Sequence, residues 1–508
     1  MEFNKTDLTV SSFKRVYESN LEQSVDTDFT LPDYYPEIVK ILKVIPEINI
    51  MSSQCNENRV GIGGQVVLSL LYYGSDDKIN SYTHIYPFTK SQDAEVPENG
   101  CISVQPFVGY MNSKAIAPRK VEVHGSLALS VSVDSVDNKS ILSSTDCEGI
   151  YLKSAEKPFL KFYDVLTKSV FIEDEIQISQ NAPAIEKVIR NSATATITEC
   201  KFISGKAVVK GDVKLEILYC PTQSNKPILL TEVKGFSQIF DCSVECENPN
   251  FESSVRVECF EIHPKTGLDG DVRNIAFETR LGVQIIPYCM ENNNIVIDAF
   301  TGKYIADIKY DNINAETVAE NIFENFVCKK KIEFGDALTD ISDIWSKVSV
   351  DYTAKDNNCV LVKGTVNVFI LGIDGEGKPT YFERPIEYEY RYELNKEIDN
   401  LRCRPQISVV AIQYSLSAEG TIELSAELKI TATVYSVESV RAVTGVSVDF
   451  DSIVYKDSDT AMILYYPENE TVWDIARKYC TCPKKICEAN GLDNEETVCN
   501  SVLLIPNV

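Results

Sequence analysis

One short apolar pattern occurs three times in this chain, at intervals as long as a whole domain. Its copies are Gly64–Tyr73, Gly211–Cys220 and Gly364–Leu371, which share an initial glycine and start 147 and 153 residues apart. Solenoid repeats are roughly 20–50 residues long, so this spacing excludes a stacked array and indicates three copies of one domain-sized module. The 508 residues leave room for three or four domains of roughly 100–200 residues each.

Alternation of apolar and polar residues with period two predicts β-strands in these modules. In the stretch 119–133 one face is apolar and His124 points away from it. In 383–394 the apolar face is rich in tyrosine, which we expect to pack against the sheet, although exposed tyrosines also make good interface anchors. The residues expected to face inward are Val121, Val123, Leu127, Leu129, Val131, Val133, Ile386, Tyr388, Tyr390, Tyr392, Leu394, Ile422, Leu424, Ala426, Leu428, Ile430, Ala432 and Val434. The pattern therefore predicts a mainly β, multidomain chain with three repeated antiparallel β-sandwich-like modules.

Polar segments between the copies predict where the modules end. The segments 134–146 and 291–294 are expected to be connectors, each followed by further strand-like sequence. We therefore expect one β module at 1–134, a second at 135–290, a third at 291–455 and a small C-terminal domain at 456–508.

Composition and charge exclude several classes of partner. The chain has 49 lysines and arginines against 75 aspartates and glutamates, a formal net charge of −26. Such a field repels phosphate backbones and anionic lipid, so no nucleic-acid partner is expected. The start of the sequence lacks a basic run followed by an apolar core, and the longest apolar runs, such as 66–73, are far shorter than the roughly 20 residues of a membrane helix. We expect a cytoplasmic chain without membrane insertion.

The last fifty residues change from strand-like to helical patterns. The expected elements are a strand at 462–466, a helix that begins at Thr471 with Asp474 completing a capping box, a second helix that begins near Pro483, and a strand at 502–505. The pair Asn490-Gly491 supplies a left-handed stop after the second helix. The C-terminal domain is thus expected to be a small βααβ unit.

This unit resembles the LysM domain. The segment Asn469–Tyr479, NETVWDIARKY, corresponds to the LysM signature, and Asn490-Gly491-Leu492 and Ile505-Pro506 also match. The resemblance implies a shallow groove between the loops 467–472 and 490–493, which in LysM domains usually binds N-acetylglucosamine polymers. The implied partner- or glycan-binding residues are Asn469, Glu470, Thr471, Val472, Asn490, Gly491 and Leu492. Trp473 is either a ligand contact or, more often in so small a domain, an anchor of the core or its rim.

The three upstream copies resemble the SPOCS domain of clostridial spore proteins. The likeness is carried by Pro183–Val188, by the strand Gly211–Tyr219 and by Asp298–Tyr304, which we interpret as a linker. Three such modules followed by one LysM domain resemble the SipL-like spore-coat morphogenetic proteins. The resemblance implies a scaffold made in the mother-cell cytoplasm and recruited to the forespore surface and spore coat. Its implied partners are the coat-basement ATPase, bound through the LysM domain, and other coat proteins.

No catalytic constellation is found in the sequence. The segment 372–379 has P-loop spacing up to Lys378, but Pro379 replaces the magnesium-binding Ser or Thr, so a hairpin turn is expected. His124 and His263 lie in or beside strands without a visible nucleophile. No catalytic residue, metal or cofactor is expected, and we predict that the chain is not an enzyme.

Sixteen cysteines are scattered along the chain, and most are expected to be small buried hydrophobes. Cys242 and Cys246 alternate along an expected strand, which favours packing. The C-terminal domain contains Cys480, Cys482, Cys487 and Cys499, for which reduced thiols are favoured, with a disulfide or a zinc site as alternatives.

Two other functions stay open. A peptidoglycan- or cortex-binding protein would use the LysM groove, whereas a wall hydrolase would need a catalytic domain that the sequence does not show. The acidic Glu468 and Glu470 favour a protein partner with basic residues over a glycan.

Overall fold

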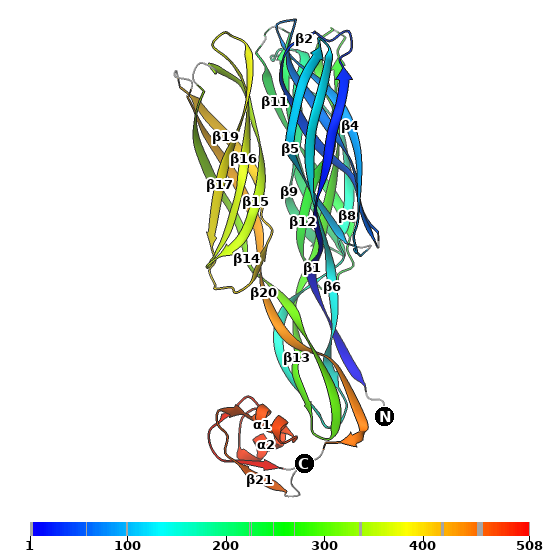
Figure 1. The fold of residues 1–508 in the computed structure, drawn as a ribbon, viewed down its shortest axis with the longest axis vertical. Helices are drawn as coiled ribbons and strands as arrows, with labels where there is room; N and C mark the ends of the chain where they lie inside the picture. The colour runs from blue at the N-terminus through cyan, green and yellow to red at the C-terminus, as the bar shows by residue number, and fades with distance from the viewer. Residues whose placement is uncertain are drawn as a thin grey trace.

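The computed structural model describes residues 4–506 except 57, 98–99, 223, 225, 247, 269, 335–337, 418–420 and 455–460. The described residues form 24 strands and two helices in an elongated molecule, with a wide head of β-sheets, a narrow twisted stalk and a small C-terminal unit at the far end (Figure 1). Neither helix is long and apolar enough to cross a membrane. The expectation of a mainly β, multi-sheet chain is confirmed.

The first β-sandwich of the head pairs two three-stranded antiparallel sheets. One sheet has the order β1(Lys5–Thr30), β6(Lys120–Thr145), β5(Cys101–Ala117), and the other has the order β2(Ile38–Asn56), β3(Arg59–Gly74), β4(Ile79–Asp93). Valines and leucines of β6 and β3 meet in one buried cluster between the sheets. The expected inward residues from Val121 to Val133 are all buried, and His124 is exposed.

The other two sandwiches have the same order of strands within their layers, although in the second one a single pair, Ile185 with Val272, joins the two layers into one sheet. In the second, β8(Leu166–Gln177), β13(Val272–Thr301) and β12(Asn250–Thr266) face β9(Ile185–Ile203), β10(Lys206–Pro221) and β11(Ile228–Asp241). In the third, β14(Tyr304–Glu333), β20(Thr421–Ile453) and β19(Gln406–Leu416) face β15(Asp340–Asp356), β16(Cys359–Ile373) and β17(Pro379–Glu393), and the short β18(Leu401–Cys403) also pairs with β20. Tyr388 and Tyr390 are buried in the third core, as the alternation predicts.

The repeated glycine has a packing role in each sandwich. It lies directly opposite an aromatic residue of the next strand, in the pairs Gly64–Phe88, Gly211–Phe236 and Gly364–Tyr388. A Cβ on Gly211 would lie 2.5 Å from the Phe236 ring and closer still to the backbone oxygen of Thr196. The ring covers the bare backbone, so only glycine fits there.

The three sandwiches also contact one another in the head. Leu71, Leu218 and Leu371 hold the same position in the repeated pattern, and all three lie in one buried cluster. Beside it the guanidinium of Arg190 pairs with the Asp343 carboxylate at 2.9 Å, and both side chains are largely buried. The second and third sandwiches are therefore joined by apolar contacts and by a buried ion pair.

The stalk consists of three two-stranded ribbons that continue from the head. They are the outer parts of β1 with β6, of β7(Ile150–Phe162) with β13, and of β14 with β20. All three ribbons contribute to a buried cluster of Val10, Ile141, Phe159, Ile295, Ile313, Ala315, Val440 and Ala442.

The connectors expected at 134–146 and 291–294 were wrong. Residues 134–145 are the second half of β6, and 291–294 lie within β13. Within 134–145 only Val136, Ile141 and Leu142 are apolar, and 291–294 is Glu-Asn-Asn-Asn, so the low hydrophobicity reflects narrow ribbons that bury few side chains and not loops. The proposed boundaries at 134 and 290 thus fall inside continuous strands, and the division into domains stays a prediction.

Candidate functional site

The C-terminal unit is built from two short helices between short strands. Its elements are β21(Met462–Tyr465), β22(Glu470–Thr471), α1(Val472–Lys478), α2(Pro483–Asn490), β23(Val498–Cys499) and β24(Leu503–Pro506). β21 pairs antiparallel with β24, and β22 pairs with β23. The two helices pack on these strands around a core that includes Trp473, Ile475 and Ile486.

The first group of expected binding residues begins helix α1. Thr471 accepts a hydrogen bond from the Asp474 backbone N–H, and the Asp474 carboxylate accepts one from the Thr471 backbone, so the expected capping box is confirmed. Val472 is fully buried. Glu470 accepts a hydrogen bond from the Tyr465 hydroxyl, and Asn469 has a left-handed backbone with φ of 57°.

The second group of expected binding residues ends helix α2. The Asn490 side-chain amide donates to the Leu504 carbonyl at 2.7 Å, and its oxygen accepts from the Leu504 N–H, also at 2.7 Å. Gly491 has φ of 63° and forms the expected left-handed stop. Leu492 packs on the core of the unit. Asn490 therefore takes the place of a neighbouring strand along one edge of β24.

The two groups share the core of the unit, where Val472 and Leu492 pack on the same cluster, but their described hydrogen bonds run to different segments. The Val472 and Trp473 backbone N–H groups donate to the carbonyls of Thr497 and Glu495, so the first turn of α1 is covered by the segment that precedes β23. The backbone N–H of Asn469 donates to the Asn500 side chain. The amides that begin α1 are thus used within the unit, while Asn490–Leu492 are bonded to α2 and β24.

Trp473 fixes the C-terminal unit to the tip of the stalk. The ring is 1% exposed, and it packs edge-on against Phe300 of β13 with the ring centroids 4.9 Å apart. Its indole Nε1 donates to the Asp298 Oδ2 at 2.9 Å. The interpretation of Trp473 as an anchor of the core or rim is therefore confirmed. Its contacts with Asp298 and Phe300 also anchor the unit to another part of the chain.

Asp298 accepts hydrogen bonds both from the stalk and from the C-terminal unit. Besides Trp473, the Tyr310 hydroxyl donates to its Oδ1 at 2.9 Å, and the Arg477 guanidinium of α1 lies 2.5 Å from the same oxygen. Burial raises the pKa of Asp298, but the hydrogen bonds from Trp473 and Tyr310 and the Arg477 charge outweigh it, so the pKa is lowered overall. The carboxylate is therefore ionised at neutral pH and is the polar centre of the docking contact.

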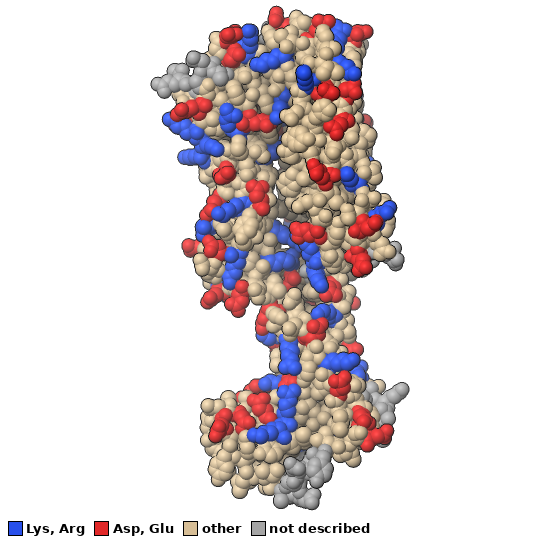
Figure 2. Space-filling model, viewed as in Figure 1, with Lys and Arg blue, Asp and Glu red and all other residues tan. Residues whose placement is uncertain are grey.

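Further contacts surround this centre. Lys153 of β7 pairs with Glu496 at 2.8 Å, and the rings of Tyr151 and Phe300 lie 5.1 Å apart. A Cβ on Gly302 would lie 2.9 Å from the Cys480 backbone oxygen, so the hairpin approaches the unit closely. On the visible face of the molecule positive and negative side chains are interspersed, without one large area of a single sign (Figure 2).

The docking residues of the stalk were not predicted from the sequence. The segment Asp298–Tyr304, interpreted as a linker, is the end of β13, a tight turn and the start of β14. Asp298, Phe300 and Tyr310 belong to this hairpin, and Arg477 faces it from α1. One available signal was Trp473 itself, because a buried indole N–H needs an acceptor and its own small unit offers few.

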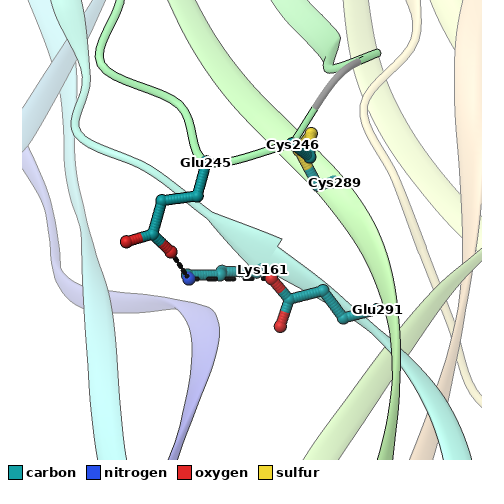
Figure 3. The surroundings of a disulfide bond; sticks show 5 residues. All are labelled: Lys161, Glu245, Cys246, Cys289 and Glu291. Carbon is teal, nitrogen blue, oxygen red and sulfur yellow. Dashed lines mark hydrogen bonds and ion pairs between the residues drawn. A yellow bond between two sulfur atoms is a disulfide. The ribbon is translucent and has the colours of Figure 1, made fainter.

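One disulfide bond joins Cys246 and Cys289, 43 residues apart in the sequence (Figure 3). The packing interpretation of Cys246 was therefore wrong. β11 ends at Asp241, so Cys242 and Cys246 lie in a loop, where Cys246 can reach β13. Nearby, Lys161 pairs with Glu245 at 2.6 Å and with Glu291 at 3.6 Å. Cys480, Cys482, Cys487 and Cys499 are free thiols in the structure.

The P-loop-like segment is a hairpin turn, as expected. Ile373 pairs with Pro379 across the end of β16 and β17. The Asp374 carboxylate accepts hydrogen bonds from the backbone N–H groups of Glu376 and Lys378 at 3.0 and 2.9 Å. The Asp374 carboxylate thus accepts the backbone hydrogen bonds of this turn, which in a P-loop a phosphate would accept.

Comparison with known proteins gives one match. A family model described as SipL, SPOCS domain, matches residues 184–263, which run from the start of β9 into β12 of the second sandwich. No curated protein and no solved structure matches the chain. The match covers 80 of the 508 residues, so this part of the chain is similar to the SPOCS domain of the SipL family, and the similarity suggests a sporulation-related role at the spore coat.

Proposed function

We propose that this chain is a non-enzymatic scaffold for assembly of the spore coat. In this proposal the three sandwiches are all SPOCS modules, and the C-terminal unit is a LysM domain. The scaffold is made in the mother-cell cytoplasm, and its C-terminal unit recruits it to the forespore surface by binding the coat-basement ATPase. Other coat proteins bind the head, where several surfaces on one chain raise avidity by effective concentration.

The proposal rests on the SPOCS match together with the elongated shape of the molecule, in which a stalk holds the head and the C-terminal unit apart. The match lies in the head, whereas the C-terminal unit lies at the opposite end of the stalk (Figure 1). With a shape of this kind, one end can bind a surface while the other end stays accessible to further partners. Glycan binding is less well supported, because the backbone amides of the first loop and the Asn490 side chain already have partners within the unit.

The test is binding of the full chain to the purified ATPase and, separately, to purified peptidoglycan. The matched control is the chain truncated after residue 454, which keeps the head and the stalk. We expect the ATPase to retain the full chain and not the truncated one. Retention of the full chain by peptidoglycan alone would reject the scaffold proposal and favour a wall-binding protein.

A further inference from the structure

The outward face of β21 is an unusual apolar surface for so small a unit. Met462, Leu464 and Tyr466 are 56%, 65% and 72% exposed, and they alternate with Ile463 and Tyr465, which pack toward the core. Val502 and Leu504 on and beside β24 are exposed as well. Single exposed apolar residues are common on proteins, but a contiguous cluster marks an interaction surface.

The outer backbone edge of β21 also has no hydrogen-bond partner among the residues that the structure describes. The Leu504 N–H and carbonyl bond to the Asn490 side chain, so they point away from β21. In an antiparallel pair the opposite residue, Leu464, then also directs its N–H and carbonyl away from its partner strand. No residue that the structure describes hydrogen-bonds to this outer edge of β21. One edge of the two-stranded sheet is therefore closed by Asn490, and the other is open within the described part of the chain.

We propose that β21 binds an extended segment of a partner protein as an additional strand. The partner strand would pair with the backbone of Met462 and Leu464 and place alternate apolar side chains on Leu464 and Tyr466. Strand addition of this kind uses main-chain hydrogen bonds for affinity and side-chain contacts for specificity. This inference rests on the proposed function, because it states how the partner of the C-terminal unit is bound.

The negative charge of this chain favours a different protein over a second copy of the chain as the partner of β21. β21 itself carries no charged residue, and residues 461–506 contain seven aspartates and glutamates against four lysines and arginines, so the unit is acidic. Of its four basic residues, Arg477 is used by Asp298 and Lys478 lies near Glu470, while Lys484 and Lys485 of α2 are exposed. Two copies with a formal charge of −26 each would repel, whereas a strand flanked by lysine or arginine would be attracted. The proposed occupant is therefore an extended apolar segment with basic flanks.

The sharpest test removes one donor of the open edge. Leu464→Pro deletes the outward N–H without removing a hydrogen bond to β24, and proline is tolerated on edge strands. Leu464→Ala is the matched control, because it loses the same side chain and keeps the N–H. We expect the full-length Leu464→Pro variant to bind the ATPase about tenfold more weakly than Leu464→Ala, since one backbone hydrogen bond is lost. Equal affinities of these two variants would overturn strand addition.

A measurement on the unmodified chain guards against misfolding of the variant. In the free protein the Leu464 amide should exchange with solvent faster than the Ile463 amide, and it should become protected when the ATPase binds. Binding without that protection also overturns the proposal.

A second probe separates this proposal from the proposed function. It is a synthetic nonapeptide of alternating valine and threonine with two lysines at each end, compared with the same peptide flanked by glutamates. If the ATPase does not bind but the lysine-flanked peptide protects Leu464, strand addition stands and the named partner is wrong. If neither the ATPase nor this peptide protects Leu464, strand addition is rejected.

Discussion

The indole nitrogen of Trp473 donates a hydrogen bond to Asp298, which lies 175 residues earlier in the chain. This contact joins the C-terminal unit to the hairpin at the stalk tip. The LysM-like signature thus places its tryptophan at an internal interface, next to Phe300 and away from solvent. A partner of the C-terminal unit must then use another face while the unit is docked, and β21 provides one.

Asp298→Ala should release the C-terminal unit from the stalk. The substitution leaves the Trp473 N–H and the Arg477 charge without their buried acceptor, which costs about 1–3 kcal/mol or more. We expect the tryptophan emission to shift to longer wavelength, and this shift should vanish when Trp473 is also replaced by Phe.

The matched control for this substitution is Asp311→Asn, which removes an exposed pair with Lys139 on β14. Exposed pairs contribute little, so its emission should equal that of the unmodified chain. An unchanged emission spectrum in Asp298→Ala would contradict the docking role of this carboxylate.

Docking should be independent of pH near neutrality and weaken in acid. The pKa of Asp298 is lowered in the folded protein, so the ionised form is favoured by docking. A group of this kind adds stability above its unfolded pKa of about 3.9, and that stability is lost as pH falls toward the folded value. Tryptophan emission should stay constant from about pH 7 to 5 and change below about pH 4. Asp298→Asn should lose this acid transition, and a transition near pH 6 would assign the effect to another group.

Removal of the disulfide should destabilise the second sandwich. The Cys246–Cys289 bond closes a loop across 43 residues and ties the segment between β11 and β12 to β13. Loss of a bridge over such a loop costs about 2–4 kcal/mol, chiefly by freeing the unfolded chain. The double substitution Cys246→Ser, Cys289→Ser should lower the urea midpoint of the unfolding step that involves this sandwich.

The matched control is Cys259→Ser, which changes a free and partly exposed thiol of β12. Its urea midpoint should stay close to that of the unmodified chain. Treatment of the unmodified chain with a reducing agent should reproduce the double variant, and an unchanged midpoint after full reduction would show that the bond adds no stability.

The fold class could be predicted from the sequence because strand alternation is a local property. Val121 to Val133 and Ile386 to Leu394 each present one apolar face, and the sheets bury those faces. The stalk could not be predicted in this way, because residues 134–145 and 291–294 form narrow ribbons with little apolar surface. Their burial depends on two other ribbons that are distant in the sequence.

The candidate site was predicted in its local features and missed in its long-range ones. Thr471, Pro483 and Gly491 begin and end helices as expected, since capping depends on neighbouring residues. Asp298 and Cys289 find their partners only after the chain has folded over 175 and 43 residues. No spacing pattern in the sequence predicts such pairings, so the docking contact and the disulfide could be identified only from the structure.

Gly211→Ala should destabilise the second sandwich, although the change adds only one methyl group. The new Cβ would overlap the Phe236 ring and the Thr196 backbone oxygen. Overpacking of this kind costs about 1–3 kcal/mol. Gly235→Ala is the matched control, because Gly235 lies on the adjacent strand with no atom closer than 3.9 Å to a new Cβ. Since alanine is favoured over glycine within strands, this control should be neutral or slightly stabilising.

The two variants are compared by their urea midpoints, and equal midpoints would reject the packing role of the repeated glycine. The double variant Gly211→Ala, Phe236→Leu separates the two overlaps. Because the Thr196 oxygen belongs to the backbone and cannot move aside as a side chain can, the double variant should remain destabilised. The same result is expected at Gly64 and Gly364, whose new Cβ atoms would also meet a backbone oxygen and an aromatic side chain. The glycine that begins each copy of the pattern is then required both by a backbone oxygen of the preceding strand and by the aromatic side chain of the following strand.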